Sequence, residues 1–307
     1  MASPLKLADF GENCVVERLT ALLPPMPPSV LTGPGDDCAV IEMAPGQPLT
    51  LLKADSVIEG IHFVPDEQMQ RVGWKALCRA ISDIAAMGGR PLHALVALAA
   101  PPETPWQRVA DLYKGLRGAA ETFQVSIVGG ETCHTAGPLV CSIFLTGSVP
   151  AEHCVLRSGG YPGDFVLVTG RLGGSLESGR HLDFSPRLEE GQWLAQRGCV
   201  HAMMDLSDGI AVDGPRLAKA SQCGLSIDIN AIPCHEGCGI TQAVSDGEDF
   251  ELLLAISPDE LESLLHDWRV AFPQLPLSVV GRLTKAEDGM QPAEIFENRG
   301  YDHFQQS

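Results

Sequence analysis

Basic residues are scarce in this sequence. It holds 21 lysines and arginines against 39 aspartates and glutamates, which gives a formal net charge of -18. A protein that binds nucleic acid presents a basic face to the phosphates, so we expect no nucleic-acid partner. If so acidic a chain binds a phosphorylated ligand, metal ions have to bridge its carboxylates to that ligand.

Long apolar runs are also missing. None approaches the ~20 residues of a transmembrane helix, so we expect no membrane partner. The apolar stretch Leu19–Leu23 runs into the proline-rich segment Pro24–Pro28 and does not have the pattern of a signal peptide. The ten cysteines follow no framework spacing. Even between Cys234 and Cys238 there are three residues rather than the usual two, which favours an ordinary loop. We therefore expect reduced thiols in a cytoplasmic protein.

Several nucleotide-binding and catalytic signatures do not occur. There is no Gly-Lys-Ser/Thr of a Walker A loop, no dinucleotide G-x-G-x-x-G after a strand, no G-x-S-x-G elbow and no kinase His-Arg-Asp loop. Aromatic residues make up only 6% of the chain, without the basic and aromatic interleaving that supports base stacking. Any nucleotide chemistry here must use another architecture.

What the sequence does contain is an alternation of short apolar runs and helical patterns. Apolar spacing predicts a helix over about 72–87, with Leu77, Ile81 and Ile84 on one stripe and Gly88-Gly89 at its end. Other helices are expected at 105–123, 186–196 and 210–221, and strands at 38–42, 49–53, 92–98, 125–128, 139–149, 165–169, 225–229, 251–256 and 277–280. Near Pro150 the first series of strands and helices ends and a second series begins. We predict a mixed α/β fold of two domains, residues 1–150 and 151–307.

Carboxylates recur inside the apolar segments. They are Asp36, Asp37, Asp55, Asp83, Glu131, Asp205 and Asp208. A carboxylate among apolar residues loses hydration and needs a hydrogen bond, a cation or a raised pKa. Because cations are few, metal ions are the expected partners. Carboxylates without a thiolate or imidazole cluster favour Mg²⁺ or Mn²⁺ over zinc.

Each of these acids also has a local explanation. Asp36 and Asp37 follow Gly-Pro-Gly and suit a turn. Asp83 is one helical turn from Arg79, which suits an ion pair. Asp205, Ser207 and Asp208 precede a helix and suit an N-cap, and Glu248-Asp249 suits a solvated charge run. Without a metal site, all of these separate explanations would have to be true at once, so we favour a shared metal site.

Seven segments, in this order along the chain, resemble the thiamine-monophosphate kinase family. They are Gly35–Ala39, Asp55–Phe63, Gly73–Gly88, Arg157–Asp164, Asp205–Gly209, Gly247–Leu252 and Gly300–Phe304. The Ser82–Gly88 block and the Gly300–Phe304 tail are the specific ones, and Pro-Gly-Asp within the fourth segment is not. The resemblance runs from about residue 10 to residue 304.

This resemblance implies a fold and an activity. The family belongs to the aminoimidazole-ribonucleotide-synthetase-like superfamily of ATP-binding proteins, which implies two α/β domains and a homodimer formed through the N-terminal sheets. The residues 1–150 would bind metal and ATP and form the dimer, and residues 151–307 would complete the active-site cleft. The implied reaction is ATP-dependent phosphorylation of thiamine monophosphate to thiamine diphosphate, with several Mg²⁺ ions and no covalent enzyme intermediate.

The resemblance also implies roles for individual residues. The metal ligands would be Asp37, Asp55, Asp83, Glu131, Asp205 and Asp208. The ATP contacts would be Tyr113, Gly130, Glu131, Arg157 and Ser207, and the substrate contacts His62, Glu248 and Tyr301. Catalysis would depend on Asp55, Asp83, Asp205 and Arg157.

Four positions depart from the family pattern. Glu131 stands where the family has Asp, His134 lies in a segment that lacks the family's Arg, Lys53-Ala54 replace two hydroxyl residues, and Asp246 replaces Gly. Two alternatives therefore stay open: a related ATP-dependent enzyme acting on another substrate, and a non-catalytic paralogue that binds nucleotide or thiamine phosphates.

Overall fold

The structure, a computed structural model, describes residues 5–297. Tyr301 and the Gly300–Phe304 tail lie outside the described residues. The strands are β1 Val30–Thr32, β2 Ala39–Ile41, β3 Leu49–Ile58, β4 Arg90–Ala100, β5 Ser126–His134, β6 Val140–Val149, β7 Phe165–Thr169, β8 Val200–Asp205, β9 Cys223–Ile227, β10 Leu252–Ile256, β11 Leu277–Lys285 and β12 Met290–Gln291. The α-helices are α1 Glu12–Thr20, α2 Met69–Ala86, α3 Trp106–Thr122, α4 Ser175–Ser178, α5 Leu188–Ala195, α6 Ile210–Ala220, α7 Ile240–Ser245, α8 Leu261–Ala271 and α9 Ala293–Glu297.

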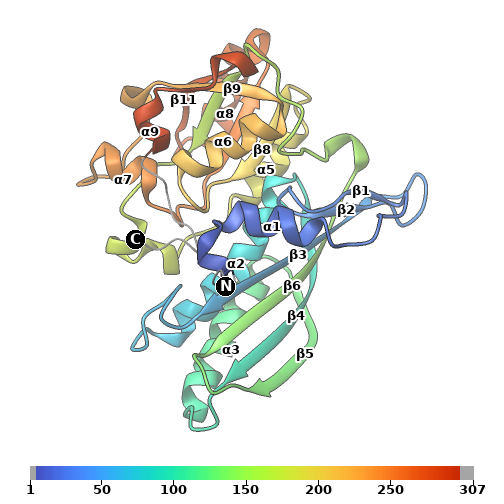
Figure 1. Ribbon diagram of the computed structural model, residues 1–307, viewed down its shortest axis with the longest axis vertical. Coiled ribbons are helices and arrows are strands. Elements are labelled where there is room, and N and C mark those ends of the chain that lie inside the picture. Colours follow the sequence, from blue (N-terminus) through green and yellow to red (C-terminus); the bar gives the residue numbers. More distant parts are fainter. Residues whose placement is uncertain (1–4, 298–307) are drawn as a thin grey trace.

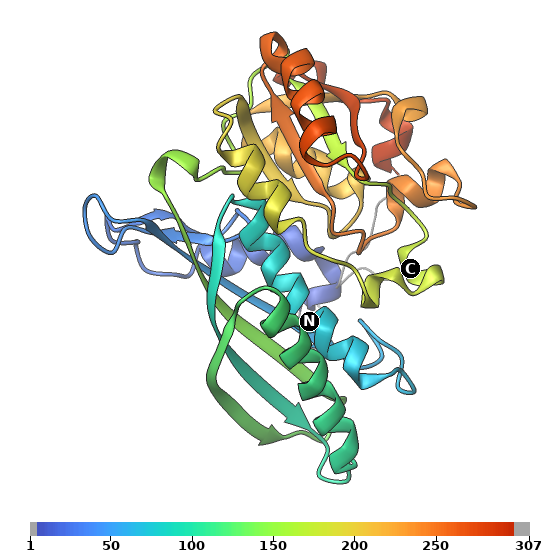
Figure 2. The same ribbon diagram turned by 180° about the vertical axis from the view of Figure 1, so that it is seen from behind.

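The first half of the chain forms a six-stranded sheet with the strand order β1-β2-β3-β6-β4-β5. Only β4 and β5 are parallel, and the other neighbours are antiparallel. Helices α2 and α3 cover one face, and Figures 1 and 2 show the sheet from its two sides. Along β6 the residues Cys141, Ile143 and Leu145 are buried, whereas Phe144 between them is exposed. This alternation is what a sheet covered on one side requires.

Helices α2 and α3 cross at a pair of glycines. A Cβ atom on Gly73 would lie 2.0 Å from the Leu112 carbonyl oxygen, and one on Gly115 would lie 1.9 Å from the Gln70 carbonyl oxygen. The two backbones can therefore approach only because neither glycine has a side chain. The predicted stripe of Leu77, Ile81 and Ile84 is fully buried against the sheet, and Gly88, with φ 69°, ends the helix as expected.

The second half forms another six-stranded sheet, with the order β12-β9-β11-β7-β10-β8. Helices cover both of its faces. Val166 and Val168 of β7 pack into a cluster with α6, α7 and α9, whereas Leu167 packs into a cluster with α5 and α8. Because both faces are buried, β7 and β10 read in the sequence as continuous apolar runs.

The predicted mixed α/β fold with two domains is confirmed. The first sheet uses residues 30–149 and the second 165–291, and the domains lie one above the other in Figure 1. Four strands are longer than predicted: β3 continues to Ile58, β5 to His134 and β11 to Lys285, and β4 extends at both ends to Arg90 and Ala100. No helix among residues 5–297 is both long enough and apolar enough to cross a membrane.

Candidate active site

A cavity of about 650 Å³ lies where the two domains meet. Its lining comes from α1, the loop before β2, β3 and α2 on one side, and from Arg157, the end of β8 and α6 on the other. The lining residues that carry charge or were singled out in the sequence are Glu12, Glu17, Asp36, Lys53, Asp55, Arg79, Asp83, Arg157, Asp205, Ser207, Asp208, Arg216 and Lys219. Six of the predicted site residues, drawn from both domains, line this cavity: Asp55, Asp83, Arg157, Asp205, Ser207 and Asp208.

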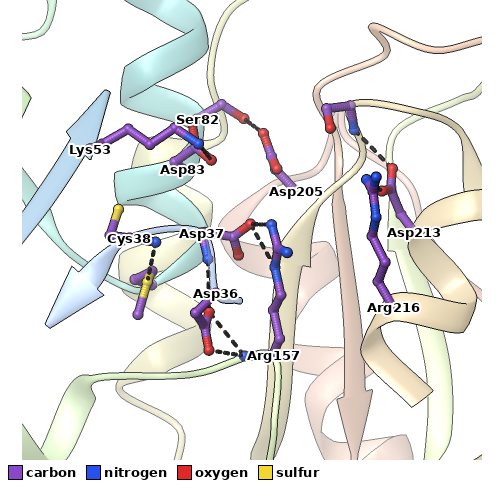
Figure 3. A network of polar contacts seen from close by, with 12 residues as sticks. Asp36, Asp37, Cys38, Lys53, Ser82, Asp83, Arg157, Asp205, Asp213 and Arg216 are labelled. Carbon is purple, nitrogen blue, oxygen red and sulfur yellow. Dashed lines mark hydrogen bonds and ion pairs between the residues drawn. The ribbon is translucent and has the colours of Figure 1, made fainter. Parts of the chain in front are cut away.

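Three carboxylates converge beside this cavity. Asp37 follows the Gly-Pro-Gly turn, Asp83 lies in α2 and Asp205 ends β8, and they are only 2%, 5% and 3% exposed. One oxygen from each lies within 4.8 Å of the others. Figure 3 shows the three side chains pointing toward one another from three separate elements.

The partners of these carboxylates differ. Arg157 donates to Asp37 Oδ1 through Nε at 3.0 Å and through Nη2, while Asp37 Oδ2 is buried and has no hydrogen-bond partner. Asp83 Oδ1 accepts from Lys53 Nζ at 2.5 Å. Asp205 Oδ2 accepts from the Ser82 hydroxyl at 2.7 Å. A buried carboxylate oxygen without a partner is costly and indicates a cation that completes the site.

Burial shifts the protonation of this cluster. Burial, and then the charge of Asp37, raise the pKa of Asp205 to about 6. Asp36, whose carboxylate accepts from the Arg157 backbone N–H, has its pKa raised to about 6 for the same two reasons. Burial also raises the pKa of Asp83, although the Lys53 ammonium opposes it. A divalent cation would favour the ionised form of each group.

Asp55 belongs to a second network beside the first. Arg79 binds it through two hydrogen bonds of 3.1 Å, from Nε and Nη2. Burial opposes ionisation of Asp55, but Arg79 and Lys53 outweigh it and lower the pKa of Asp55. Arg79 also donates to Glu248 Oε1 at 2.9 Å, and the wholly buried Lys75 donates to Glu248 Oε2 at 2.6 Å. Helix α2 thereby holds an acid of the second domain.

Asp208 takes part in a third network, in the second domain. Its carboxylate pairs with Arg216, which also donates to Asp213 at 2.9 Å. The other Asp213 oxygen accepts from the backbone N–H groups of Ser207 and Asp208 at 3.0 and 2.9 Å. Burial, followed by the charge of Asp208, raises the pKa of Asp213 to about 8. These contacts fix the 205–208 turn at the cavity edge.

A smaller cavity of about 60 Å³ adjoins the first, because Arg79, Ser207 and Asp208 line both. His62 and Glu248, two of the predicted substrate contacts, also line it. The third, Tyr301, lies outside the described residues. Glu248 has φ 63°, a left-handed backbone conformation that favours glycine, and its side chain is held by the two α2 cations. Strain of this kind is typical of functional positions.

Four of the described predicted residues line neither cavity in the single chain. One is Asp37, which lies in the carboxylate cluster beside the larger cavity, and the other three are Tyr113, Gly130 and Glu131. Tyr113 lies on α3 and is 40% exposed, and Gly130 and Glu131 lie on the edge strand β5, where Glu131 is exposed. Gly130 also has a structural reason to be glycine, since a Cβ there would lie 1.8 Å from the Val96 carbonyl oxygen. The ATP and metal roles of these three residues stay predictions.

Asp36 and Asp37 do follow a turn, but the other local explanations for the acids are wrong. The cation paired with Asp83 is Lys53, thirty positions away, and Arg79 pairs with Asp55 and Glu248. Gly209 occupies the N-cap of α6, without a side-chain capping bond. Glu248 and Asp249 do not form a solvated run, since their side chains are 15% and 4% exposed.

The sequence prediction missed Lys75, Arg79, Asp213 and Arg216 as parts of the site. A signal existed for the first two, because they are the only cations between the apolar positions of the buried helix after Arg71. A buried cation on such a helix requires a carboxylate partner. No comparable signal marks Asp213, which accepts from two backbone N–H groups as well as from Arg216.

The fold and this acidic cleft first define a class of protein. Residues 35–149 match the family model of the AIR synthase related protein, N-terminal domain, and residues 162–290 match that of its C-terminal domain. The chain therefore has the two-domain AIR-synthase-related fold, with the carboxylate cluster where the two domains meet.

Comparison with individual relatives narrows this class to one family. The thiamine-monophosphate kinase of Rhodopirellula baltica is 39% identical over 275 residues, which is 83% of this chain and 85% of the relative. That of Salmonella typhimurium is 31% identical and covers 90% and 92% of the two chains. The solved structure of AaThiL complexed with AMPPCP and TMP superposes with a TM-score of 0.82 at 26% identity, over 98% of this chain and 100% of the other. The chain belongs to the thiamine-monophosphate kinase family.

Proposed function

We propose that this chain transfers the γ-phosphoryl group of ATP to the phosphate of thiamine monophosphate, forming thiamine diphosphate and ADP. The observation that carries the proposal is the cluster of Asp37, Asp83 and Asp205, with its unpartnered oxygen, beside a cavity between two domains. Two features of the relatives support it: the activity that the names of the relatives state, and the binding of AMPPCP and TMP by the structural relative.

The residues fit divalent metal ions of the Mg²⁺ type. The cluster offers only carboxylate oxygens, which are the ligands that Mg²⁺ prefers, and Asp37 Oδ2 is buried without a hydrogen-bond partner. Asp37, Asp83 and Asp205 would hold a first ion, and Asp55 and Asp208 are the further ligands predicted for other ions. When bound, Mg²⁺ supplies neutralisation of phosphate charge and orients the phosphates for in-line transfer.

The chain's own cations complete the charge balance. Lys53, Arg79 and Arg157 line the cavity, so their positive charges stabilise the anionic phosphates of both substrates. The nucleophile is a phosphate oxygen of thiamine monophosphate, already anionic at neutral pH, so the protein needs no strong general base. Its task is to hold two anions in line against their repulsion. No covalent enzyme intermediate forms.

The two domains divide the binding. Residues 1–150 contribute Asp37, Asp55 and Asp83, and residues 151–307 contribute Arg157, Asp205 and Asp208. Ser207 and Arg157 line the larger cavity and would contact ATP. His62 and Glu248 line the smaller cavity and would contact thiamine monophosphate, together with Tyr301. The phosphates of the two ligands would meet where the cavities adjoin.

The exposed face of the first sheet supports a homodimer. Across its register Phe144 pairs with Ala54 on one side and with Leu95 on the other, and Leu95 pairs with Gly129 of β5. Phe144 and Leu95 are 47% and 45% exposed, and Val128 of β5 is 60% exposed. An apolar row of this kind on a sheet face marks a contact surface, and a second copy of the same face would cover it.

One assay tests the activity. The purified chain is incubated with Mg²⁺, ATP and thiamine monophosphate, and thiamine diphosphate and ADP are followed together by chromatography. We expect both products in equal amounts. ADP without thiamine diphosphate would indicate a related enzyme with another substrate, and neither product would indicate a binding protein without catalysis.

A further inference from the structure

Lys53 places a fixed positive charge inside the acidic cluster. It alternates along β3 with the exposed Leu52 and Ala54, so it points with Asp55 toward α2 and the cavity. Its ammonium nitrogen lies 2.5 Å from Asp83 Oδ1, and 21% of its side chain is exposed. Lys53 therefore touches one of the clustered carboxylates and also lines the 650 Å³ cavity.

The contact between Lys53 and Asp83 matters because of how the three clustered carboxylates are neutralised. Of the three clustered carboxylates, Asp37 is paired with the guanidinium of Arg157 and Asp205 with the neutral hydroxyl of Ser82. Asp83 is paired with an ammonium, a compact point charge that a carboxylate can exchange for a metal ion. One oxygen of Asp83 is therefore already bound to a cation that belongs to the chain itself.

We propose that Lys53 is a resident cation of the phosphate-binding site, filling at Asp83 a position that a divalent ion would otherwise occupy. This inference rests on the proposed function, because it treats the cavity as the site of the ATP and substrate phosphates. A tethered ammonium a few ångströms from a metal position repels a second ion there. The chain therefore binds one divalent ion fewer, together with nucleotide, than a variant without the ammonium. It also keeps part of its affinity for nucleotide when divalent ions are removed.

Counting bound Mn²⁺ tests this directly. The full-length chain is saturated with AMPPCP and titrated with Mn²⁺, and free Mn²⁺ is followed by electron paramagnetic resonance. We expect Lys53→Met to bind one more Mn²⁺ per chain than wild type. Lys219→Met is the matched control, since Lys219 lines the same cavity but pairs with Glu17 of α1 at 3.1 Å. It should leave the count unchanged.

Further variants tie the extra ion to Asp83. Asp83→Asn and Lys53→Met/Asp83→Asn should bind equal numbers of Mn²⁺ ions, because without the Asp83 carboxylate the loss of the ammonium opens no further site. Equal counts in folded wild type and Lys53→Met would overturn the inference, as would an extra ion in the double variant compared with Asp83→Asn. Where thermal unfolding shows that Lys53→Met is misfolded, Lys53→Gln takes its place. If both misfold, wild-type binding of AMPPCP in excess chelator decides, and no measurable binding overturns the inference.

The inference and the proposed activity fail in different ways. If wild type forms thiamine diphosphate but binds the same number of Mn²⁺ ions as Lys53→Met, the proposed activity stands and the role of Lys53 as a resident cation is refuted. If Lys53→Met binds one ion more but wild type forms no thiamine diphosphate, the role of Lys53 stands and the proposed activity is refuted.

Discussion

Asp205 carries a negative charge that the folded protein tolerates poorly without a cation. Its pKa is raised to about 6, chiefly by burial, and its one hydrogen bond from a side chain comes from a neutral hydroxyl. We expect Asp205→Asn to lower kcat by about a hundredfold or more, because the site loses a charged oxygen ligand. Its thermal unfolding temperature should not fall, since a neutral amide replaces a buried charge and can still accept from Ser82.

Steady-state kinetics and thermal unfolding with and without Mg²⁺ check this prediction. Asp267→Asn is the control, because Asp267 is 40% exposed and pairs with Arg197 on the surface. An Asp205→Asn variant with wild-type turnover would remove Asp205 from the metal set. The same experiment on Asp55→Asn should also abolish turnover, since Arg79 would lose its bidentate partner beside the cavity.

Asp249 makes a separate prediction about pH. One of its oxygens is buried without a hydrogen bond, and burial is the main cause that raises its pKa from 3.8 to about 7. Between these values the folded protein holds a proton that the unfolded chain releases. The stability that Asp249 contributes is thus complete below about pH 4 and is lost as the pH rises toward 7.

Asp249→Asn removes this titration. Its unfolding temperature, compared with that of wild type, should rise between pH 5 and pH 8 by on the order of a few degrees. Thermal scans in steps of one pH unit measure the difference, with Asp267→Asn as the flat reference. A difference that is constant, or that falls with pH, would contradict the raised pKa of Asp249.

The sequence identified the acids of the buried cluster better than it identified their partners. Asp37, Asp83 and Asp205 were identified because each interrupts an apolar segment. The pairing of Asp83 was misjudged, because one turn of helix separates Asp83 from Arg79 whereas its true partner Lys53 lies on another element. Local spacing predicts contacts within a helix, but a contact between β3 and α2 depends on how the helix packs on the sheet.

At the scale of elements, the crossing of α2 and α3 depends on glycine. In Gly73→Ala the new methyl would lie 2.0 Å from the Leu112 carbonyl oxygen, so the helices must separate. We expect a loss of about 1–3 kcal/mol in the free energy of unfolding, measured by chemical denaturation. Since α2 carries Asp83, Arg79 and Lys75, activity should fall as well.

Gly118→Ala is the matched control for this crossing. It lies on the same helix α3 as Gly115, but its added Cβ would have Trp74 at 4.0 Å as its nearest neighbour. Alanine is the better helix former, so this variant should be neutral or more stable by up to about 1 kcal/mol. If both variants lost the same stability, close backbone approach would not be the reason for Gly73.

Element prediction succeeded where one periodicity dominates. The α2 pattern repeats over five turns and β7 is a continuous apolar run, and both were placed within three residues of their bounds. Strand β8 was missed, although Asp205 at its end was singled out, because its alternation of polar and apolar residues is weak in Val200–Asp205. The further extent of β3, from Ala54 to Ile58, comes from its pairing with the whole of β6. A short stretch of sequence does not show which distant strand it will pair with.

At the scale of the whole molecule, the site itself forms part of the contact between the two domains, beside contacts away from it such as the ion pair of Arg71 with Asp183. Arg157 binds Asp37, Ser82 binds Asp205, and Lys75 and Arg79 bind Glu248, so residues of the proposed chemistry also hold the domains together. A shift of one domain against the other would separate Asp205 from Asp37 and Asp83. This coupling explains why residues from distant parts of the sequence have to be considered as one group.

The proposed dimer gives the last prediction. Phe144 lies in the middle of the exposed apolar row of the first sheet, so a charge there would be buried against a second copy of the same face. We expect wild type to have the mass of two chains in light scattering, and Phe144→Asp to have the mass of one at the same concentration. A buried charge at the centre of an interface costs roughly 2 kcal/mol or more, which weakens association about thirtyfold. Val270→Asp is the control, because Val270 is 73% exposed on α8 of the other domain and should leave the mass unchanged. A monomeric wild type, or a Phe144→Asp variant that stays dimeric, would mean that this face does not form the dimer.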